Sequence, residues 1–349
     1  MLNFLRIKKK YRKFRNSLKG KIKEIRKSGL FDDHYYLKKN NDVLLSGLEP
    51  IAHFAEFGWK EGRKPNVNFD DCFYKNYYSD IKNINENPFL HYLRYGVREK
   101  RCVNMIGLQN SLRQSYRVER YLKQKKTRKA KVVLYTAIIG SYDQLLIPEY
   151  ICDDWDYVCF TDQDILSDSV FQISKPEYIA TDNCRTSRFI KTQPHLYFKG
   201  YEYSIWVDAS ILIRSNHISH TLNFCHDNNI NFMASKHPWR NCIYDEALEC
   251  ERANKDNKNI MRKQIKKYEL EGMAKHFGLL ATGIIIRQHN NEKMIKLGTE
   301  WWNEIKTGSK RDQLSIMYLL WKKNIAYRTL PVGKDILSTE DYFWINHLI

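Results

Sequence analysis

From residue 131 onward, short apolar runs alternate with stretches of helical periodicity. The apolar runs cover 131–139, 157–160, 203–207, 231–234 and 279–286. The helical patterns cover 183–199, 217–227, about 244–272, 290–306 and 311–323. Strands that alternate with helices predict an α/β layered domain with a mostly parallel sheet.

Three of the expected strands end at small or acidic residues. The first ends at 140–143, the second at Asp162 and the third at Asp208. Because ligands bind beyond the carboxyl ends of strands in an open α/β sheet, these ends predict a ligand rim. The Asp208 carboxylate suits a divalent cation that clamps a diphosphate. The alternative is an aspartate that caps the 209–211 turn.

Three basic residues share one helical face just before the strand that ends at Asp208. Arg185, Arg188 and Lys191 recur every three residues. Forked guanidinium donors and a lysine point charge suit a diphosphate. The alternative is a solvated basic face.

Acids at two helix starts, and one histidine, are candidates for catalysis. His237 precedes a helix whose first turn holds Glu246, and the two could serve a donor or acceptor sugar. Asp312 begins a later helix and could accept a proton from an acceptor hydroxyl. The alternative is an ordinary loop followed by a helix, in which the acids have no catalytic role and are favoured at the N-terminus by the helix dipole.

The formal net charge of +18 is concentrated in two peripheral segments, 1–29 and 113–131. In the first, apolar residues recur at helical spacing: Ile7, Tyr11, Phe14, Leu18, Ile22 and Ile25. This basic amphipathic helix could lie on an anionic membrane surface, or its apolar face could pack on the next domain. Residues 104–130 are expected to form a basic helical linker.

Residues 30–103 contain two units that repeat with an offset of 38 residues and no gap. The identical positions of the first unit are Phe31, Asp32, Asp33, Tyr36, Asp42, Pro50, His53, Gly58, Glu61 and Arg63. Each unit is predicted to form two short helices, the second running from proline to glycine. His53 and its equivalent His91 are expected to be packing residues. The repeats resemble units at the N-termini of bacterial surface-polysaccharide glycosyltransferases.

Several function classes lack support in the sequence. There is no Walker-type loop, no GxGxxG after a strand, no GxSxG and no HExxH. The eight cysteines form no CxxC pair, and neither a secretory signal nor a membrane-spanning run is found. We therefore expect a cytoplasmic protein with reduced thiols, which could attach to the inner face of the cytoplasmic membrane.

The motifs from residue 131 to about 335 together resemble a known family. They begin with Tyr-Thr-Ala-Ile-Ile-Gly-Ser-Tyr-Asp at 135–143 and include Ser-Ile-Trp-Val-Asp-Ala at 204–209. His-Pro-x-Arg-x-Cys-x-Tyr-Asp-Glu-Ala at 237–247 and Arg-Asp-Gln-Leu-Ser at 311–315 follow. The set resembles a glycosyltransferase-like family formerly called domain of unknown function 616. That family includes plant mucilage- and pectin-related proteins and bacterial polysaccharide glycosyltransferases.

The resemblance implies a GT-A fold over 131–349 and a nucleoside-diphosphate sugar as donor. Thr136 and Asp143 would then line the nucleoside pocket, with Asp162 near the base or ribose. Arg188 and Lys191 would face the diphosphate, and Asp208 would take the place of the Asp-x-Asp aspartate. Since Ser210 replaces the second carboxylate, either His289 or another distant group completes a Mn²⁺ or Mg²⁺ site, or the metal is bound weakly or is absent.

The sequence therefore predicts a glycosyltransferase that extends a capsule- or lipopolysaccharide-type glycan at the cytoplasmic membrane face. The acceptor is expected to be a glycan or a lipid-linked glycan, and the basic arm 1–29 is expected to hold the enzyme near an anionic membrane. Two alternatives stay open. One is a non-catalytic relative that binds glycan, and the other is a basic nucleic-acid-binding protein. The second is disfavoured because the aromatic residues recur at core-like spacing, so no nucleic-acid partner is expected.

Overall fold

The computed structural model describes residues 17–124, 131–165, 169–330 and 340–345. The chain divides into two compact units, Met1–Ser111 and Leu112–Ile349. The division falls inside α8 (Met105–Arg113), within the segment that the sequence assigns to a linker. No helix among the described residues is both long and apolar enough to cross a membrane.

The described elements of the first unit are all helical. After a helix over 17–28, each repeat contains three helices. The first repeat has α2 (Asp33–Lys39), α3 (Asn41–Ser46) and α4 (Pro50–His53), which continues as the π-helix η1 (Phe54–Gly58). The second has α5 (Asp71–Tyr77), α6 (Ser79–Lys82), α7 (Pro88–His91) and η2 (Tyr92–Gly96). The prediction of two helices per repeat is wrong, because a third short helix lies between them.

Equivalent contacts recur in both repeats. The Tyr36 hydroxyl is 2.9 Å from Nδ1 of His53, and the Tyr74 hydroxyl is 3.2 Å from Nδ1 of His91. A Cβ atom at Gly58 would overlap the Tyr36 hydroxyl oxygen, so only glycine at this position leaves room for the tyrosine side chain. The histidines are therefore packing residues, as the sequence predicts.

One repeat position differs sharply between the two units. Asp33 is exposed, whereas its equivalent Asp71 is buried. Neither carboxylate oxygen of Asp71 has a hydrogen-bond partner among the described residues. Burial, with a smaller contribution from the Asp70 carboxylate, raises the pKa of Asp71 to about 8.

The apolar face of the basic N-terminal helix is packed over its described half. Ile25 is fully buried in the core of the repeats, and Leu18 and Ile22 pack against that core. For residues 17–28, the packing alternative is therefore correct. Ile7, Tyr11 and Phe14 lie outside the described residues.

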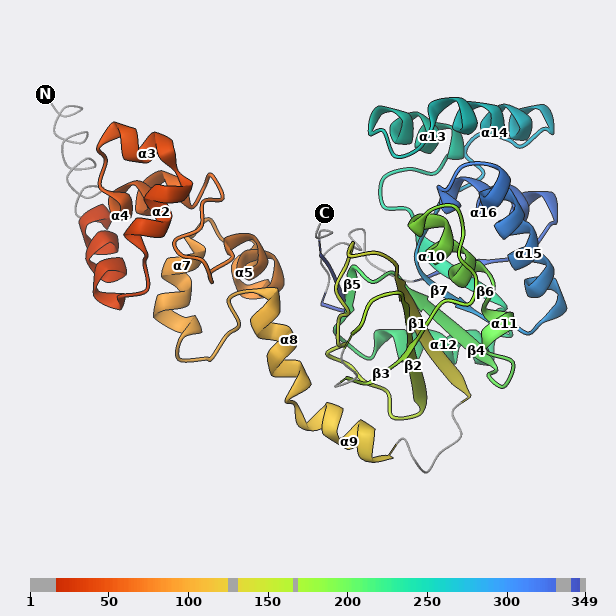
Figure 1. Ribbon diagram of the computed structural model, residues 1–349, viewed down its shortest axis with the longest axis horizontal. Helices are drawn as coiled ribbons and strands as arrows, with labels where there is room; N and C mark the ends of the chain where they lie inside the picture. Colours follow the sequence, from red (N-terminus) through yellow and green to blue (C-terminus); the bar gives the residue numbers. More distant parts are fainter. Residues whose placement is uncertain (1–16, 125–130, 166–168, 331–339, 346–349) are drawn as a thin grey trace, which may run out of the picture. The chain divides into compact units, whose positions relative to one another are not determined.

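The second unit is a mixed α/β domain around a seven-stranded sheet (Figure 1). Its strands are β1 (Val132–Ile138), β2 (Trp155–Thr161), β3 (Phe171–Ser174), β4 (Tyr203–Val207), β6 (Phe232–Lys236), β7 (Leu280–Arg287) and β8 (Arg328–Leu330). A separate pair consists of β5 (Ile211–Ile213) and β9 (Tyr342–Trp344). The helices are α9 (Tyr116–Gln124), α10 (Asn183–Thr192), α11 (Pro194–Tyr197), α12 (His217–Asp227), α13 (Ile243–Arg252), α14 (Lys258–Leu270), α15 (Glu292–Thr307) and α16 (Asp312–Lys322).

The order of the sheet is β3-β2-β1-β4-β7-β6-β8, and only β7 runs against the other strands. The prediction of a mostly parallel sheet is thus confirmed. Since β7 is inserted between β4 and β6, its amino end meets their carboxyl ends.

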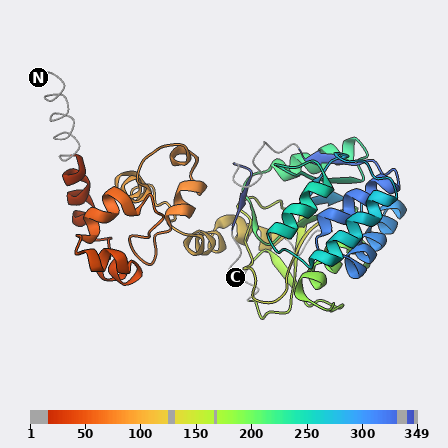
Figure 2. The same cartoon turned by 90° about the horizontal axis from the view of Figure 1, so that it is seen from above.

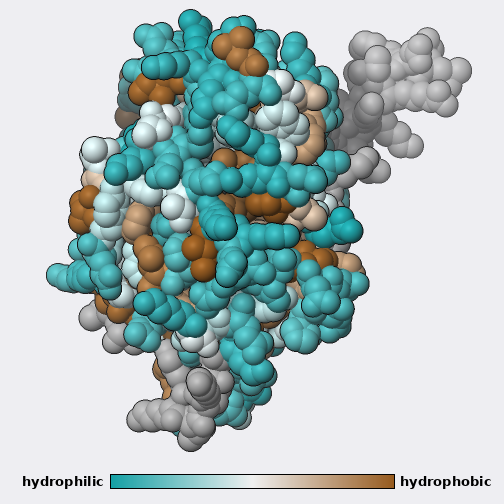
Figure 3. Space-filling model, turned by 90° about the vertical axis from the view of Figure 1, so that its right-hand side faces the viewer, coloured by the Kyte–Doolittle hydropathy of each residue, from teal (hydrophilic) through white to brown (hydrophobic). Residues whose placement is uncertain are grey.

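Side chains alternate along β1 into two hydrophobic cores, one on each face of the sheet. Val133 and Tyr135 join a core with residues of α10, α15 and α16, whereas Leu134 and Ile138 join a core with residues of α9 and α12. Figure 2 shows α13–α16 gathered at one side of the unit. That outer surface is mainly hydrophilic, with hydrophobic side chains in small groups (Figure 3).

The second half of the predicted linker belongs to the α/β unit. Val118 and Tyr121 of α9 are buried in its core, and the Tyr121 hydroxyl donates to the carbonyl oxygen of Trp155 at 2.9 Å. Residues 125–130 lie outside the described part of the chain.

Candidate functional site

Parallel pairing brings the predicted strand ends to one edge of the sheet. In the register, Ile138 of β1 lies opposite Thr161 of β2, and Tyr135 lies opposite Trp206 of β4. Asp162 and Asp208 follow these strands directly, so both lie at the carboxyl edge. This arrangement confirms the geometric premise of the predicted rim.

Asp208 is held by three neighbours at the end of β4. Trp206 Nε1 donates to Asp208 Oδ1 at 2.6 Å, and Lys191 Nζ lies 3.5 Å from the same oxygen. The Asp208 backbone N–H donates to the carbonyl oxygen of Gly283 at 2.7 Å. The side chain keeps 24% of its surface exposed, so it remains open to a ligand.

Asp312 lies deeper in the same cluster. Its Oδ2 is 2.6 Å from Lys191 Nζ and accepts a hydrogen bond from the Thr282 hydroxyl at 2.7 Å. Its Oδ1 is 3.2 Å from Arg188 Nε. Although burial alone would raise the pKa of Asp312, the charges of Arg188 and Lys191 hold it well below its ordinary value.

The resulting cluster has two cations and two carboxylates. Lys191 is fully buried, and burial lowers its pKa against the opposing effect of Asp208 and Asp312. Arg188 NH1 lies 3.9 Å from Asp208, while its buried Nε lacks a hydrogen bond of good geometry among the described residues. The Arg188 side chain keeps 16% of its surface exposed, so it is the cation of this cluster that an anionic ligand could reach.

Arg185 does not belong to this cluster. Its guanidinium pairs with Asp182 at 2.7 Å and donates to the carbonyl oxygens of Ile305 and Gly308 at 3.2 and 2.8 Å. These contacts tie the start of α10 to the end of α15. The prediction that Arg185 lies with Arg188 and Lys191 is wrong, because packing against α15 commits its guanidinium to Asp182 and to two carbonyl oxygens.

His289 lies at the opposite end of β4 from Asp208. Since β7 runs antiparallel, Arg287 pairs with Ser204 at the amino end of β4, and His289 lies beyond it. The Nε2 of His289 lies 2.7 Å from the carbonyl oxygen of Phe198, and burial lowers the pKa of the imidazole to about 4. The prediction that His289 completes a metal site with Asp208 is therefore wrong.

Among the residues that the structure describes, the contacts around Asp208 do not supply the oxygen ligands of a Mn²⁺ or Mg²⁺ site. These ions need several oxygen ligands. Asp208 is faced by Trp206, Arg188 and Lys191, and the Asp312 carboxylate is occupied by the same cations and Thr282. The positive charge that a metal would supply is already present in the two basic side chains.

The ends of β1 and β2 are tied together by Asp162. Its carboxylate accepts a hydrogen bond from the Gly140 backbone N–H at 2.9 Å. Against the effect of partial burial, hydrogen bonds from Gln163 and Gly140 lower the pKa of Asp162. The buried Thr136 hydroxyl has no hydrogen-bond partner within the described residues, and Asp143 lies beyond it in the turn after β1.

The structure brings His237 and Glu246 together at the carboxyl end of β6. His237 Nε2 is 3.5 Å from a carboxylate oxygen of Glu246, which accepts a hydrogen bond from Arg240 Nε at 2.6 Å. His237 Nδ1 accepts the Arg240 backbone N–H at 3.1 Å, so Nε2 carries the proton. Burial lowers the pKa of His237. The neighbouring Trp239 is 67% exposed.

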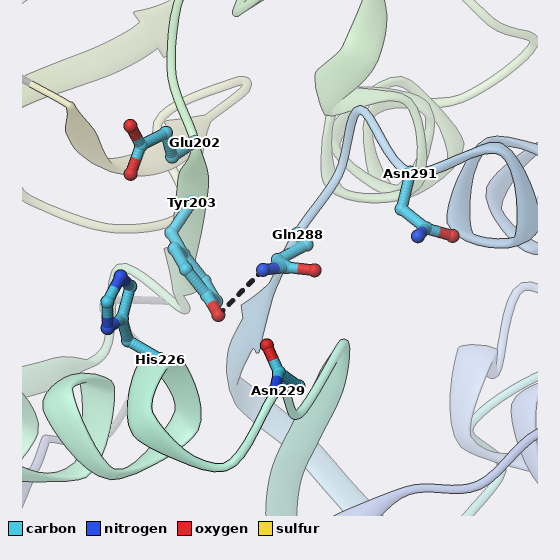
Figure 4. A pocket seen from close by; sticks show the side chains of 6 residues that line it. All are labelled: Glu202, Tyr203, His226, Asn229, Gln288 and Asn291. Carbon is cyan, nitrogen blue, oxygen red and sulfur yellow. Dashed lines mark hydrogen bonds between the residues drawn. The ribbon is translucent and has the colours of Figure 1, made fainter.

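The hollow drawn in Figure 4 lies at the other edge of the sheet. Its volume is about 400 Å³, and it is lined by Glu202, Tyr203, His226, Asn229, Gln288 and Asn291. Tyr203 begins β4 and Gln288 follows β7, so the hollow is at the amino end of β4. It contains none of the predicted site residues.

Two neighbours that hold the carboxylates of the ion cluster were not predicted from the sequence. Trp206 holds Asp208 and could have been found, because residues two apart on a strand share a face. Thr282 holds Asp312, and its signal in the sequence is a hydroxyl among the apolar residues of a buried strand.

Comparison with known proteins adds a family match and two structural likenesses. No curated protein matches the chain. A glycosyltransferase involved in glycosylation of the major capsid of PBCV-1 is 12% identical, with a TM-score of 0.28 over 46% of this chain and 65% of that one. Mouse xyloside xylosyltransferase 1, in its apo form, is 9% identical, with a TM-score of 0.34 over 58% and 84%. The chain thus spans just under two thirds of the first structure.

The family model that matches is "TOD1/MUCI70, glycosyltransferase-like domain", over residues 169–332. The matched segment includes Arg188, Lys191, Asp208 and Asp312, whereas β1, β2 and their strand ends lie outside it. The match supports a glycosyltransferase, with its glycosyltransferase-like domain at residues 169–332.

Proposed function

We propose that the chain is a glycosyltransferase of GT-A architecture that uses a nucleoside-diphosphate sugar as donor. The donor would bind at the carboxyl edge of β1, β2 and β4, with the nucleoside near Thr136, Asp143 and Asp162. The single observation that carries this proposal is the pair of cations, Arg188 and Lys191, held beside Asp208 at that edge.

The cluster suits the chemistry of sugar transfer. An acceptor hydroxyl attacks the anomeric carbon, and the bond to the diphosphate breaks with its electron pair leaving on the phosphate oxygen. The hydroxyl proton passes to the departing diphosphate or to water. Arg188 and Lys191 would stabilise that developing negative charge from fixed positions, which costs no reorganisation during the reaction. Asp208, the more exposed carboxylate, would accept a hydrogen bond from a donor hydroxyl.

Asp312 is less suited to act as a general base than the sequence suggests. A base needs a pKa near the working pH, and the two cations hold that of Asp312 well below. We propose instead that Asp312 positions Arg188 and Lys191. His237 and Glu246, beside the exposed Trp239, are the proposed acceptor side.

The acceptor is proposed to be a surface-polysaccharide glycan, free or lipid-linked, at the cytoplasmic membrane face. The support is the resemblance of the repeats to units of bacterial polysaccharide glycosyltransferases. Basic residues 1–16 would provide attraction to anionic lipid, because the apolar face over 17–28 is already packed.

Turnover of a nucleotide-sugar panel tests the donor proposal. Purified protein is incubated with each donor, with and without chelator, and release of nucleoside diphosphate is measured. We expect release from one donor class to persist in chelator, and Lys191→Met to lower the rate at least about 100-fold. Lys199→Met, at an exposed lysine, is the matched control.

Two results would contradict the proposal. One is wild-type turnover in Lys191→Met, and the other is a folded wild-type protein that turns over no donor. The second result would favour the non-catalytic glycan-binding alternative. If Lys191→Met does not fold, Asp208→Asn carries the same test, because Asp208 is partly exposed.

A further inference from the structure

Three side chains of different chemistry converge near the start of α13, and none of them belongs to the ion cluster. They are the thiol of Cys242, the carboxylate of Asp245 and the imidazole of His276. One ligand atom of each lies within 4.8 Å of the others. From this convergence we infer that the three residues bind a zinc-class divalent metal, with water as the remaining ligand.

The first two ligands are placed by one helix end. Cys242 is the N-cap of α13, and its side chain makes no capping hydrogen bond. Asp245 lies in the first turn of the same helix. The positive end of the helix macrodipole stabilises negative charge there, which favours a metal-bound thiolate and carboxylate.

The third ligand is oriented by a partner outside the set. His276 Nδ1 lies 2.8 Å from the side-chain oxygen of Asn241, the residue before Cys242. If Nδ1 donates to that oxygen, the proton is fixed on Nδ1 and Nε2 keeps its lone pair for a metal. This hydrogen bond from the second imidazole nitrogen is the usual arrangement around metal-bound histidine.

The backbone around His276 is also specialised. His276 has a φ of +58°, a left-handed conformation that is uncommon for residues other than glycine. Its loop joins α14 to β7 and is held by the Gly278 backbone N–H, which donates to the Asn241 carbonyl oxygen at 3.0 Å. A bound metal would add a second tie between this loop and the start of α13.

The ligand types indicate the class of metal. Sulfur and imidazole ligands select zinc and similar borderline ions over Mg²⁺ and Mn²⁺, which prefer oxygen. Three protein ligands with one open position differ from a closed structural zinc site. The site is independent of the donor proposal, since it uses none of the four members of the ion cluster.

Cobalt binding to the reduced full chain tests the inference. Co²⁺ bound to a thiolate gives a charge-transfer absorption band, and Zn²⁺ content is measured by elemental analysis. We expect the band at one equivalent of Co²⁺ and its displacement by Zn²⁺. Cys242→Ser should abolish the band, and Asn241→Ala should weaken binding about 10- to 100-fold while keeping the band.

Control variants separate this site from general effects on the protein. Cys225→Ser, at another buried cysteine, and His220→Ala, at another exposed histidine, should bind Co²⁺ as wild type does. If Cys242→Ser does not fold, His276→Ala and Asp245→Asn, both at exposed positions, must lower the affinity at least about tenfold. Absence of the band in wild type, or unchanged binding in these variants, would overturn the inference.

Discussion

Replacing the buried carboxyl of Asp71 by an amide should change how the stability of the repeats depends on pH. Asp71 is protonated in the folded repeats at neutral pH, because its pKa rises from 3.8 to about 8. The unfolded chain loses that proton near pH 4. The folded state therefore binds one more proton across this interval, and stability falls as pH rises from about 4 to 8 and levels off above.

The size of the effect follows from the pKa difference. A rise from 3.8 to about 8 corresponds to at most about 6 kcal/mol at pH 8 and above. Local relaxation and water entry reduce this figure, so we expect Asp71→Asn to stabilise the repeats by a few kcal/mol at pH 8. The difference between wild type and variant should shrink toward zero near pH 4.

Hydrogen exchange resolves the repeats within the full chain. Peptides from residues 71–96 are followed by mass spectrometry as urea is increased, at several pH values from 4 to 9. Asp33→Asn, at the exposed equivalent in the first repeat, should stay within about 0.5 kcal/mol of wild type throughout. Parallel pH profiles for wild type and Asp71→Asn would refute the reasoning.

Three further perturbations test contacts inside each of the two units. Thr282→Val removes the hydroxyl that donates to Asp312 and should cost about 1–3 kcal/mol in urea unfolding, with unchanged stability as the contradicting result. Because the pKa of Asp312 is lowered in the folded state, its charged form stabilises the fold above about pH 4, and this stabilisation is lost as the pH falls further. Asp312→Asn should therefore weaken the loss of stability in acid. Urea unfolding midpoints at pH 3 and 6 measure this difference. Gly58→Ala should destabilise the first repeat by about 1–3 kcal/mol because its Cβ would overlap the Tyr36 hydroxyl, whereas Gly20→Ala meets open space and should not.

The sequence alone determined the elements that depend on local patterns. Helix α12 has the predicted bounds 217–227, and the apolar runs at 131–139 and 203–207 became β1 and β4. Proline and glycine set the ends of α4–η1 and α7–η2. In these segments the period of the apolar residues and the residues at the ends indicate the same element, so tertiary contacts did not change the predicted secondary structure.

Short strands and helix breaks escaped the local patterns. Strands β3, β5, β8 and β9 have only three or four residues each, too few to show a period. The predicted helix over 244–272 is divided into α13 and α14, where Asn257 caps the second helix through its side chain. Such a cap is visible in sequence only once the break is suspected.

Tertiary structure decided which polar residues meet. The sequence placed Arg185, Arg188 and Lys191 on one helical face, but packing against α15 turned Arg185 away from the other two. The antiparallel insertion of β7 brought Thr282 to the cluster and carried His289 to the other edge of the sheet. Strand direction cannot be read from an apolar run, because its period is the same in both directions.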